Sequence, residues 1–268
     1  MVELSKEQYY YAKHLLPTEE GYVAPKAVVC GNNPGWVFVD SLPSPKIMIV
    51  WAQGNNGFYF IGMDIVKYAD EINLVIDLII KSRLLSKGTD CFEFSSVPLV
   101  TDEELKSIFH LRKLKEWTQT TFTFKKSMAR VYSAPFEGQL WDIRELEKNY
   151  SLINTGFVHK KILKHWESLD AFFAKANGFF IIVDNAVASF AFTGWIANNV
   201  HEISIETMEA YRRKGFAKVC AAKLVNYYLQ NGFSPYWECA SGNTASVKIA
   251  QTLGFTQLSD YTCYAFKL

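Results

Sequence analysis

The sequence has no long apolar run, no pair of cysteines at metal-binding spacing and almost no net charge. Its apolar stretches fall far short of the ~20 residues that span a bilayer. The N-terminus, MVELSKEQYYYAKHLL, lacks the apolar segment of a signal peptide. The five cysteines form no CxxC pair, which argues against a disulfide framework and against a zinc site. We therefore expect a cytoplasmic protein with no membrane partner and no metal.

The balance of charge excludes another class of partner. The formal net charge is +1, so no global field draws the protein toward nucleic acid, and we expect no nucleic-acid partner. Any anion site must therefore be local. Hydrophobic residues make up 49% of the chain and aromatic residues 15%, which is typical of a globular protein with a substantial core and many sheet positions.

The order of predicted elements occurs twice along the chain. Each half reads strand, strand, strand, helix, strand, helix, which indicates a tandem duplication, although unrelated α/β segments can look alike at this level. The helix over 70–86 is apolar nearly all round, so we expect it to be buried. Thr101 opens the next helix with a capping-box pattern. The expected elements are strands 36–39, 46–52, 58–62 and 91–97 and helix 70–86 in the first half, then strands 179–183, 186–193, 201–207 and 235–240, helices 215–230 and 243–253, and closing strand-like runs at 255–258 and 262–268.

A basic loop stands at the start of the helix over 215–230. Arg212, Arg213 and Lys214 precede Gly215, and Ala217 follows two residues later. First-turn N–H groups have no partner within a helix, and a glycine lets an anion approach them closely. The spacing matches neither GxGxxG nor GxxxxGK[ST]. A solvated basic turn before an amphipathic helix is the alternative, and the strand–loop–helix–strand–helix context favours an anion site.

Three short motifs in this region resemble the acetyl-CoA core of the GCN5-related N-acetyltransferases (GNAT). They are Arg212-x-x-Gly215-x-Ala217, Asn243-x-x-Ser246 and Ala250-x-x-Leu253-Gly254-Phe255. The resemblance covers roughly residues 140–268 and is greatest to a bacterial GNAT acetyltransferase subgroup connected with zwittermicin-type resistance proteins. It implies an α/β (α+β) fold, with a mixed, mostly antiparallel sheet and flanking helices, here in two GNAT-like halves.

The resemblance also implies acetyl-CoA as the cosubstrate. In this family the pyrophosphate lies on the loop amides, here 213–217, and the pantetheine arm lies between two splayed strands, here 201–207 and 235–240. The residues expected to bind coenzyme A are Ile205, Glu206, Thr207, Arg212, Arg213, Lys214, Gly215, Phe216, Ala217, Asn243 and Ser246. Asn243 is also expected to cap its helix.

Direct attack of an amine on a thioester needs a base, and three residues are candidates. Counting back from Gly215, His201 takes the position where several family members carry a base carboxylate, and a bulge would exchange it with Glu202. Glu238, in the facing strand, is the third candidate. A solvent-facing or structural role is the alternative for Glu202.

The residue that protonates the leaving thiolate in many family members is absent from this chain. Many family members carry a tyrosine seven residues after the motif asparagine, and this chain has Ala250 there. Tyr264, Tyr261 and Ser246 are the candidates to replace it. Packing is the favoured explanation for both tyrosines, and a plain first-turn serine is the alternative for Ser246. Cys239 lies on the strand beside the expected thioester. A buried structural cysteine is the favoured interpretation, and an acyl acceptor is the alternative.

The first half lacks the Arg-x-x-Gly-x-Ala pattern. Asp64, Asp70 and Glu71 make the corresponding region anionic, so we expect it to bind no coenzyme A. The expected domains are residues 1–130, a degenerate GNAT-like domain that forms one wall of the acceptor cleft, and residues 131–268, the acetyl-CoA-binding catalytic domain.

Three functions follow from these expectations. The first is an acyl-CoA-dependent N-acetyltransferase that modifies the primary amine of a small molecule. The second is an aminoacyl or peptidyl-type transferase, a class that also pairs two such domains but does not need the basic loop. The third is a non-catalytic acyl-CoA sensor, suggested by the missing tyrosine. The partner is a small-molecule amine, and the protein is a monomer or a homodimer.

Overall fold

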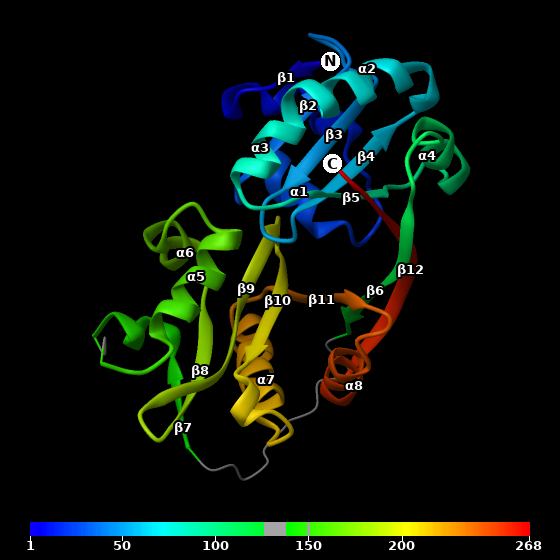
Figure 1. Cartoon of the computed structure of the whole chain (residues 1–268). Coiled ribbons are helices and arrows are strands. Elements are labelled where there is room, and N and C mark those ends of the chain that lie inside the picture. Colours follow the sequence, from blue (N-terminus) through cyan, green and yellow to red (C-terminus); the bar gives the residue numbers. More distant parts are fainter. Residues whose placement is uncertain (126–137, 149–150) are drawn as a thin grey trace. The chain divides into compact units, whose positions relative to one another are not determined.

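The chain folds into two compact units. The computed structural model describes residues 1–125, 138–148 and 151–268. The first unit comprises Met1–Gln119 with Asp260–Leu268, and the second comprises Thr120–Ser259. Figure 1 shows a sheet flanked by helices in each of them. The expected domain boundary at 130/131 lies outside the described residues.

The first unit is built on a mixed sheet in the order β1-β2-β3-β4-β5-β12. Neighbouring strands from β1 to β4 are antiparallel, β4 and β5 are parallel, and β12 pairs antiparallel with β5. The bounds of these strands are Val2–Glu3 (β1), Gly35–Val39 (β2), Ile47–Ala52 (β3), Gly57–Gly62 (β4), Cys91–Ser96 (β5) and Phe255–Lys267 (β12).

Helices of the first unit follow the predicted order with one correction. The predicted helix 70–86 is α2, one π-helical turn (Ile76–Ile80) and α3, but it is not buried all round as expected. Ile72, Ile76 and Ile80 face the core, whereas Leu78 is 69% exposed, because a helix packed on one sheet buries only one stripe. The helices are α1 (Val23–Val29), α2 (Ala69–Val75), α3 (Lys81–Ser86) and α4 (Asp102–Ile108), with 3-10 turns at Lys6–Leu15 and Ile65–Tyr68.

The predicted capping box at Thr101 is confirmed. Glu104 N–H donates to the Thr101 hydroxyl at 3.2 Å, and Thr101 N–H donates to the Glu104 carboxylate at 2.8 Å. Beneath this helix the core is aromatic, and Phe58 and Phe92 stack at 4.3 Å. Burying each such ring contributes roughly 1.5–3 kcal/mol, so this unit has its own core.

The second unit has a sheet in the order β12-β6-β11-β10-β9-β8-β7. Strands β7 to β10 are antiparallel, and β10 pairs with β11 in parallel. The bounds are Lys115–Phe124 (β6), Gln139–Asp142 (β7), Gly178–Val183 (β8), Ala186–Ala197 (β9), Val200–Thr207 (β10) and Ser234–Ala240 (β11).

Two core clusters lie on the two faces of this sheet. One cluster contains Cys220, Leu224 and Tyr228 of α7, and the other contains Val158 of α5 and Phe172 of α6. The helices are α5 (Thr155–His165), α6 (Leu169–Lys175), α7 (Phe216–Gln230) and α8 (Thr244–Leu253), with 3-10 turns at Ile143–Lys148 and Glu209–Tyr211. Both clusters include residues of β9, and all residues of this strand are buried.

Each half shows the same order of three antiparallel strands, a helix, a parallel strand and a second helix, so the predicted tandem architecture is confirmed. The strand that ends each half pairs with a strand of the other half: β12 lies beside β5, and β6 lies beside β11. The two runs expected at the C-terminus form the single strand β12. The unit boundaries differ from the expected domain 131–268 at the C-terminal end, because Cys263–Lys267 pairs with β5.

Candidate functional site

The basic loop ends in a backbone conformation that suits an anion. Arg213 has φ +65° and Gly215, which precedes the first residue of α7, has φ +81°. The Gly215 carbonyl accepts bonds from the N–H groups of Lys218 and Val219 at 3.1 and 3.3 Å. A Cβ built on Gly215 would meet nothing within 4 Å. The glycine is therefore required by its positive φ, and the space beside it is open.

Strands β10 and β11 splay apart next to this loop. Their parallel register covers Val200–Glu202 with Ser234–Tyr236, whereas β10 stays paired with β9 as far as Thr207. The register with β9 shifts between His201 and Ile203, where Glu202 lies opposite two residues of β9, Gly194 and Trp195, so the extra residue of the bulge is on β9. A bulge increases the local twist of the strand pair, and this one lies where the pairing of β10 with β11 ends.

A cavity of about 660 Å³ lies where the loop, the splayed strands and α8 meet. All of the residues expected to bind coenzyme A line it except Lys214, whose ammonium lies 5.5 Å from the centre of the Tyr211 ring. Its lining includes Ile205, Glu206, Thr207, Arg212, Arg213, Gly215, Phe216, Ala217, Trp237, Asn243 and Ser246. The geometry thus brings the motif residues into one concave surface.

The start of α8 is fixed by side-chain hydrogen bonds. Ser246 N–H donates to the Asn243 side-chain oxygen at 3.1 Å, so the predicted capping role of Asn243 is confirmed. Trp237 Nε1 donates to the Ser246 hydroxyl at 3.0 Å. Ser246 is therefore held in place at the cavity wall by a buried indole.

Among the described carboxyl groups of the second unit, that of Glu202 has the largest pKa shift. Its side chain is buried, and burial, followed by repulsion from Glu238, raises its pKa to about 8. The Ser204 hydroxyl donates to the carboxylate at 3.3 Å. A Cβ on Gly194 would lie 2.3 Å from the Glu202 Oε2 atom, so the glycine leaves the room that this carboxyl group fills.

The other two base candidates lie differently. Glu238 is partly buried and accepts a hydrogen bond from the Tyr236 hydroxyl at 3.0 Å. His201 stacks on Phe233 at 4.0 Å and contacts Tyr228 of α7, and burial lowers its pKa to about 4. The structure therefore brings Glu202 and Glu238 into electrostatic contact, whereas the imidazole of His201 is enclosed among aromatic rings.

The acid candidates are dispersed. Tyr264 belongs to the core of the first unit, packs against Phe94 at 5.4 Å, and has its pKa raised by burial. Tyr261 is also in the first unit, 6.1 Å from Tyr22. Of these candidates, Ser246 alone lines the cavity. At the position of the family tyrosine, Ala250 is buried in the core.

Cys239 and Glu206 have structural contacts that bear on their roles. Cys239 is partly buried, and burial raises the pKa of its thiol, so it is a poor nucleophile at neutral pH. The Glu206 carboxylate forms an ion pair with Lys161 of α5 while lining the cavity. This pair places a cation and an anion together at the end of β10.

Two residues beside Glu202, His165 and Gly194, were not expected from the sequence. His165 of α5 is partly buried, and desolvation lowers its pKa to about 4. Its ring lies 5.2 Å from Trp195, and its Cδ2 atom lies 3.3 Å from the Cβ position built on Gly194. The available signal was Gly194 itself, because a glycine within a strand pattern marks a close approach.

No helix among the described residues is long and apolar enough to cross a membrane. In the same part of the chain, no group of three or more His, Cys, Asp or Glu side chains is placed to hold a metal ion.

Comparison with solved structures supports the tandem fold. The chain is similar to a GCN5-related N-acetyltransferase-like protein from Streptococcus suis 89/1591, with TM-score 0.69, 18% identity and coverage of 97% of this chain and 99% of that one. It is also similar to a tandem GNAT protein from the clavulanic acid biosynthesis pathway, with TM-score 0.60, 10% identity and coverage of 99% and 97%.

Sequence comparison identifies the family. The protein called "Uncharacterized N-acetyltransferase YdfB" from Bacillus subtilis (strain 168) is 24% identical over 268 residues, which cover 98% of this chain and 97% of that protein. The family model for the GNAT acetyltransferases matches residues 14–264. The loop, the splayed strands and the N-x-x-S helix start thus occur in a chain that belongs to the GNAT acetyltransferase family.

Proposed function

We propose that this protein transfers the acetyl group of acetyl-CoA to the primary amine of a small molecule by direct attack. The observation that carries the proposal is the cavity shared by the basic loop, the end of β10 and the start of α8. Family membership supports an acyl-CoA-dependent N-acetyltransferase. The motif residues in the cavity support the more specific choice of coenzyme A as the carrier.

The residues that are present fit the phosphate groups of coenzyme A. Positive φ at Arg213 and Gly215, with open space beside the glycine, leaves room for an anion next to the first turn of α7. The helix dipole and the guanidinium groups of Arg212 and Arg213 favour negative charge there. Because the net charge of the chain is only +1, this attraction is local.

When bound, acetyl-CoA supplies an electrophilic thioester carbonyl and a thiolate leaving group. The chain supplies the groups that handle protons. Glu202, with its pKa raised to about 8, is matched to accept a proton from an ammonium group near neutral pH. Glu238 adds negative charge that favours a cationic acceptor. Ser246 is the candidate at the cavity wall for donating a hydrogen bond to the departing sulfur.

The test compares two glycines at opposite ends of α7. Gly215 and Gly232 have φ +81° and +78°, and a Cβ on either would meet nothing within 4 Å. Gly215→Ala and Gly232→Ala should therefore destabilise the fold by similar amounts, about 1–2 kcal/mol each. Only Gly215→Ala disturbs the amides beside the cavity, and we expect it to weaken acetyl-CoA binding about tenfold or more, measured by calorimetry.

Catalysis is then followed as thiol release with a panel of primary amines. Failure of acetyl-CoA to bind the wild-type protein, or equal weakening by both glycine variants, would overturn the assignment of the loop. No acetyl-CoA binding combined with transfer from an aminoacyl donor would favour the peptidyl-type transferase. Binding without thiol release from any amine would favour a sensor, the reading suggested by Ala250 in the family tyrosine position.

A further inference from the structure

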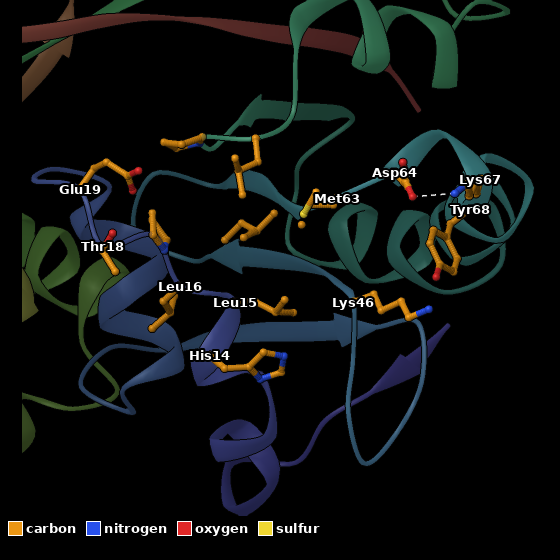
Figure 2. Close-up of a pocket in the computed structure, with 15 residues that line it drawn as sticks. His14, Leu15, Leu16, Thr18, Glu19, Lys46, Met63, Asp64, Lys67 and Tyr68 are labelled. Carbon is orange, nitrogen blue, oxygen red and sulfur yellow. Dashed lines mark hydrogen bonds and ion pairs between the residues drawn. The ribbon is translucent and has the colours of Figure 1, made fainter.

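The first unit contains a cavity of its own. It has a volume of about 590 Å³ and is lined only by residues of that unit. Its walls are the end of β4, the loop after β4, the segment at Pro98–Leu99 and the end of the N-terminal 3-10 helix (Figure 2). It therefore lies at the end of the parallel pair β4/β5, where the second unit has its cavity at the end of β10/β11.

The backbone around this cavity is unusually constrained. Gly62 has φ +126°, and a Cβ there would lie 2.4 Å from the Lys46 carbonyl oxygen. Asp64 has φ +56° and Leu99 has φ +86°. A left-handed conformation is costly for a bulky residue such as leucine and is retained where the surroundings enforce it, commonly at functional sites.

The middle of the cavity is apolar. Leu15, Leu16, Met63 and Leu99 line it, and Figure 2 shows Leu15, Leu16 and Met63 in its central part. Met63 is 66% and Leu99 72% exposed. Exposed side chains of this size, gathered around one concavity, favour an apolar ligand over water.

Charges lie at the two ends. Figure 2 places Lys46, Asp64 and Lys67 on one side of the apolar part and Glu19 on the other. Lys67 is paired with Asp64 at 2.6 Å, so one of the two ammonium groups is balanced and the charge of that end is +1. The nearby Asp40 carboxylate does not line the cavity and accepts bonds from the N–H groups of Lys46 and Ile47 at 2.8 and 3.1 Å.

We propose that this cavity binds an elongated monocarboxylate with an apolar body. The carboxylate lies against the ammonium groups of Lys46 and Lys67, and the hydrocarbon part lies on Leu15, Leu16 and Met63. Glu19 at the opposite end disfavours a second anionic group. Acetyl-CoA is a poor fit, because Asp64 occupies the loop where the second unit has Arg213 and Gly215. The inference does not depend on the function proposed for the second unit.

The test uses octanoate with the full-length protein labelled at the methionine methyl groups with ¹³C. We expect the Met63 methyl signal, assigned with Met63→Leu, to shift saturably with octanoate. The Met208 signal of the second unit should not move and serves as an internal control. Octylamine has the same chain with the opposite charge, and it should leave the Met63 signal essentially unchanged.

Two lysine variants separate recognition from stability. Lys46→Met keeps the aliphatic stem and removes the charge, and it should weaken octanoate binding about tenfold. Lys113→Met changes an exposed lysine of the same unit outside the cavity and should bind octanoate as the wild type does. Equal shifts with octylamine, no shift with octanoate, or wild-type affinity in Lys46→Met would each overturn the proposal. A Met63 shift with acetyl-CoA matching that with octanoate would instead indicate a second acyl-CoA site.

Discussion

Replacement of Glu202 by glutamine should remove a large pH-dependent penalty from the folded state. The carboxyl group has a pKa of about 8 in the folded protein, whereas the ordinary pKa of a glutamate is 4.5. The folded state therefore keeps its proton between these values, while the unfolded chain loses it. Because the pKa is raised on folding, stability is greatest below pH 4.5 and declines as the pH rises toward 8.

The size of this effect follows from the shift. At about 1.36 kcal/mol per pKa unit, ionisation of Glu202 lowers the free energy of unfolding by about 3 kcal/mol at pH 7 and about 5 kcal/mol at pH 9, relative to pH 4.5. Glu202→Gln has the same shape and no titration. We expect the difference in stability between the variant and the wild type to grow by about 4 kcal/mol from pH 5 to pH 9.

Urea denaturation at several pH values measures this difference directly. Glu238→Gln is the matched control, since it removes the charge that adds to the shift and leaves the buried carboxyl in place; we expect a smaller slope, not a flat line. Parallel pH dependences for wild type and Glu202→Gln would refute the assignment of a buried, proton-retaining carboxyl. If Glu202 is the base, kcat/KM of the wild type should rise with pH through about 8 and fall roughly 10²–10⁴-fold in the variant.

Three further changes test the surroundings of this carboxyl. Gly194→Ala places a Cβ 2.3 Å from the Glu202 Oε2 atom, so steady-state kinetics should show a lower kcat with little change in KM for acetyl-CoA, whereas Gly156→Ala, at an open helix position, should leave both unchanged. Tyr228→Phe removes a buried hydroxyl that bonds to a threonine of β9 at 2.7 Å, and thermal unfolding should show a loss of about 1–3 kcal/mol. Burial lowers the His201 pKa to about 4, so this residue contributes about 3 kcal/mol of stability above pH 6.5 that is lost as the pH falls toward 4. The stability of His201→Phe, measured by urea denaturation, should therefore depend less on pH over that range. The same pH dependence in the variant and the wild type would contradict the burial of the imidazole.

Local patterns predicted much of the second unit. The R-x-x-G-x-A spacing located a loop with positive φ at Arg213 and Gly215, and Asn243 caps its helix as expected. Counting back from Gly215 allowed for a bulge that exchanges His201 with Glu202; the structure has a bulge at this point, but its extra residue is on β9, opposite Glu202. These features depend on neighbours in the sequence, and turn and cap chemistry is readable at that range.

Features that depend on distant residues were not predictable. Hydrophobicity around the whole of 70–86 suggested a fully buried helix, but only one stripe has a sheet to pack against, and Leu78 remains exposed. The contact of His165 with the region of Gly194 joins α5 to β9; the glycine within a strand marks a close approach, but the sequence does not say which residue approaches. Tyr264 looked like a catalytic candidate because its strand follows the cosubstrate motifs, yet it packs in the core of the first unit.

The pairing of β12 with β5 bears on how the protein is made. Lys267 of β12 pairs with Cys91 of β5, which is synthesised far earlier. As the ribosome proceeds, strands β1 to β5 emerge while the strand that covers β5 does not yet exist. The edge of β5 is then open to pairing with other chains. Deleting the part of β12 that pairs with β5 is therefore a change to the first unit, although these residues are made after the whole of the second.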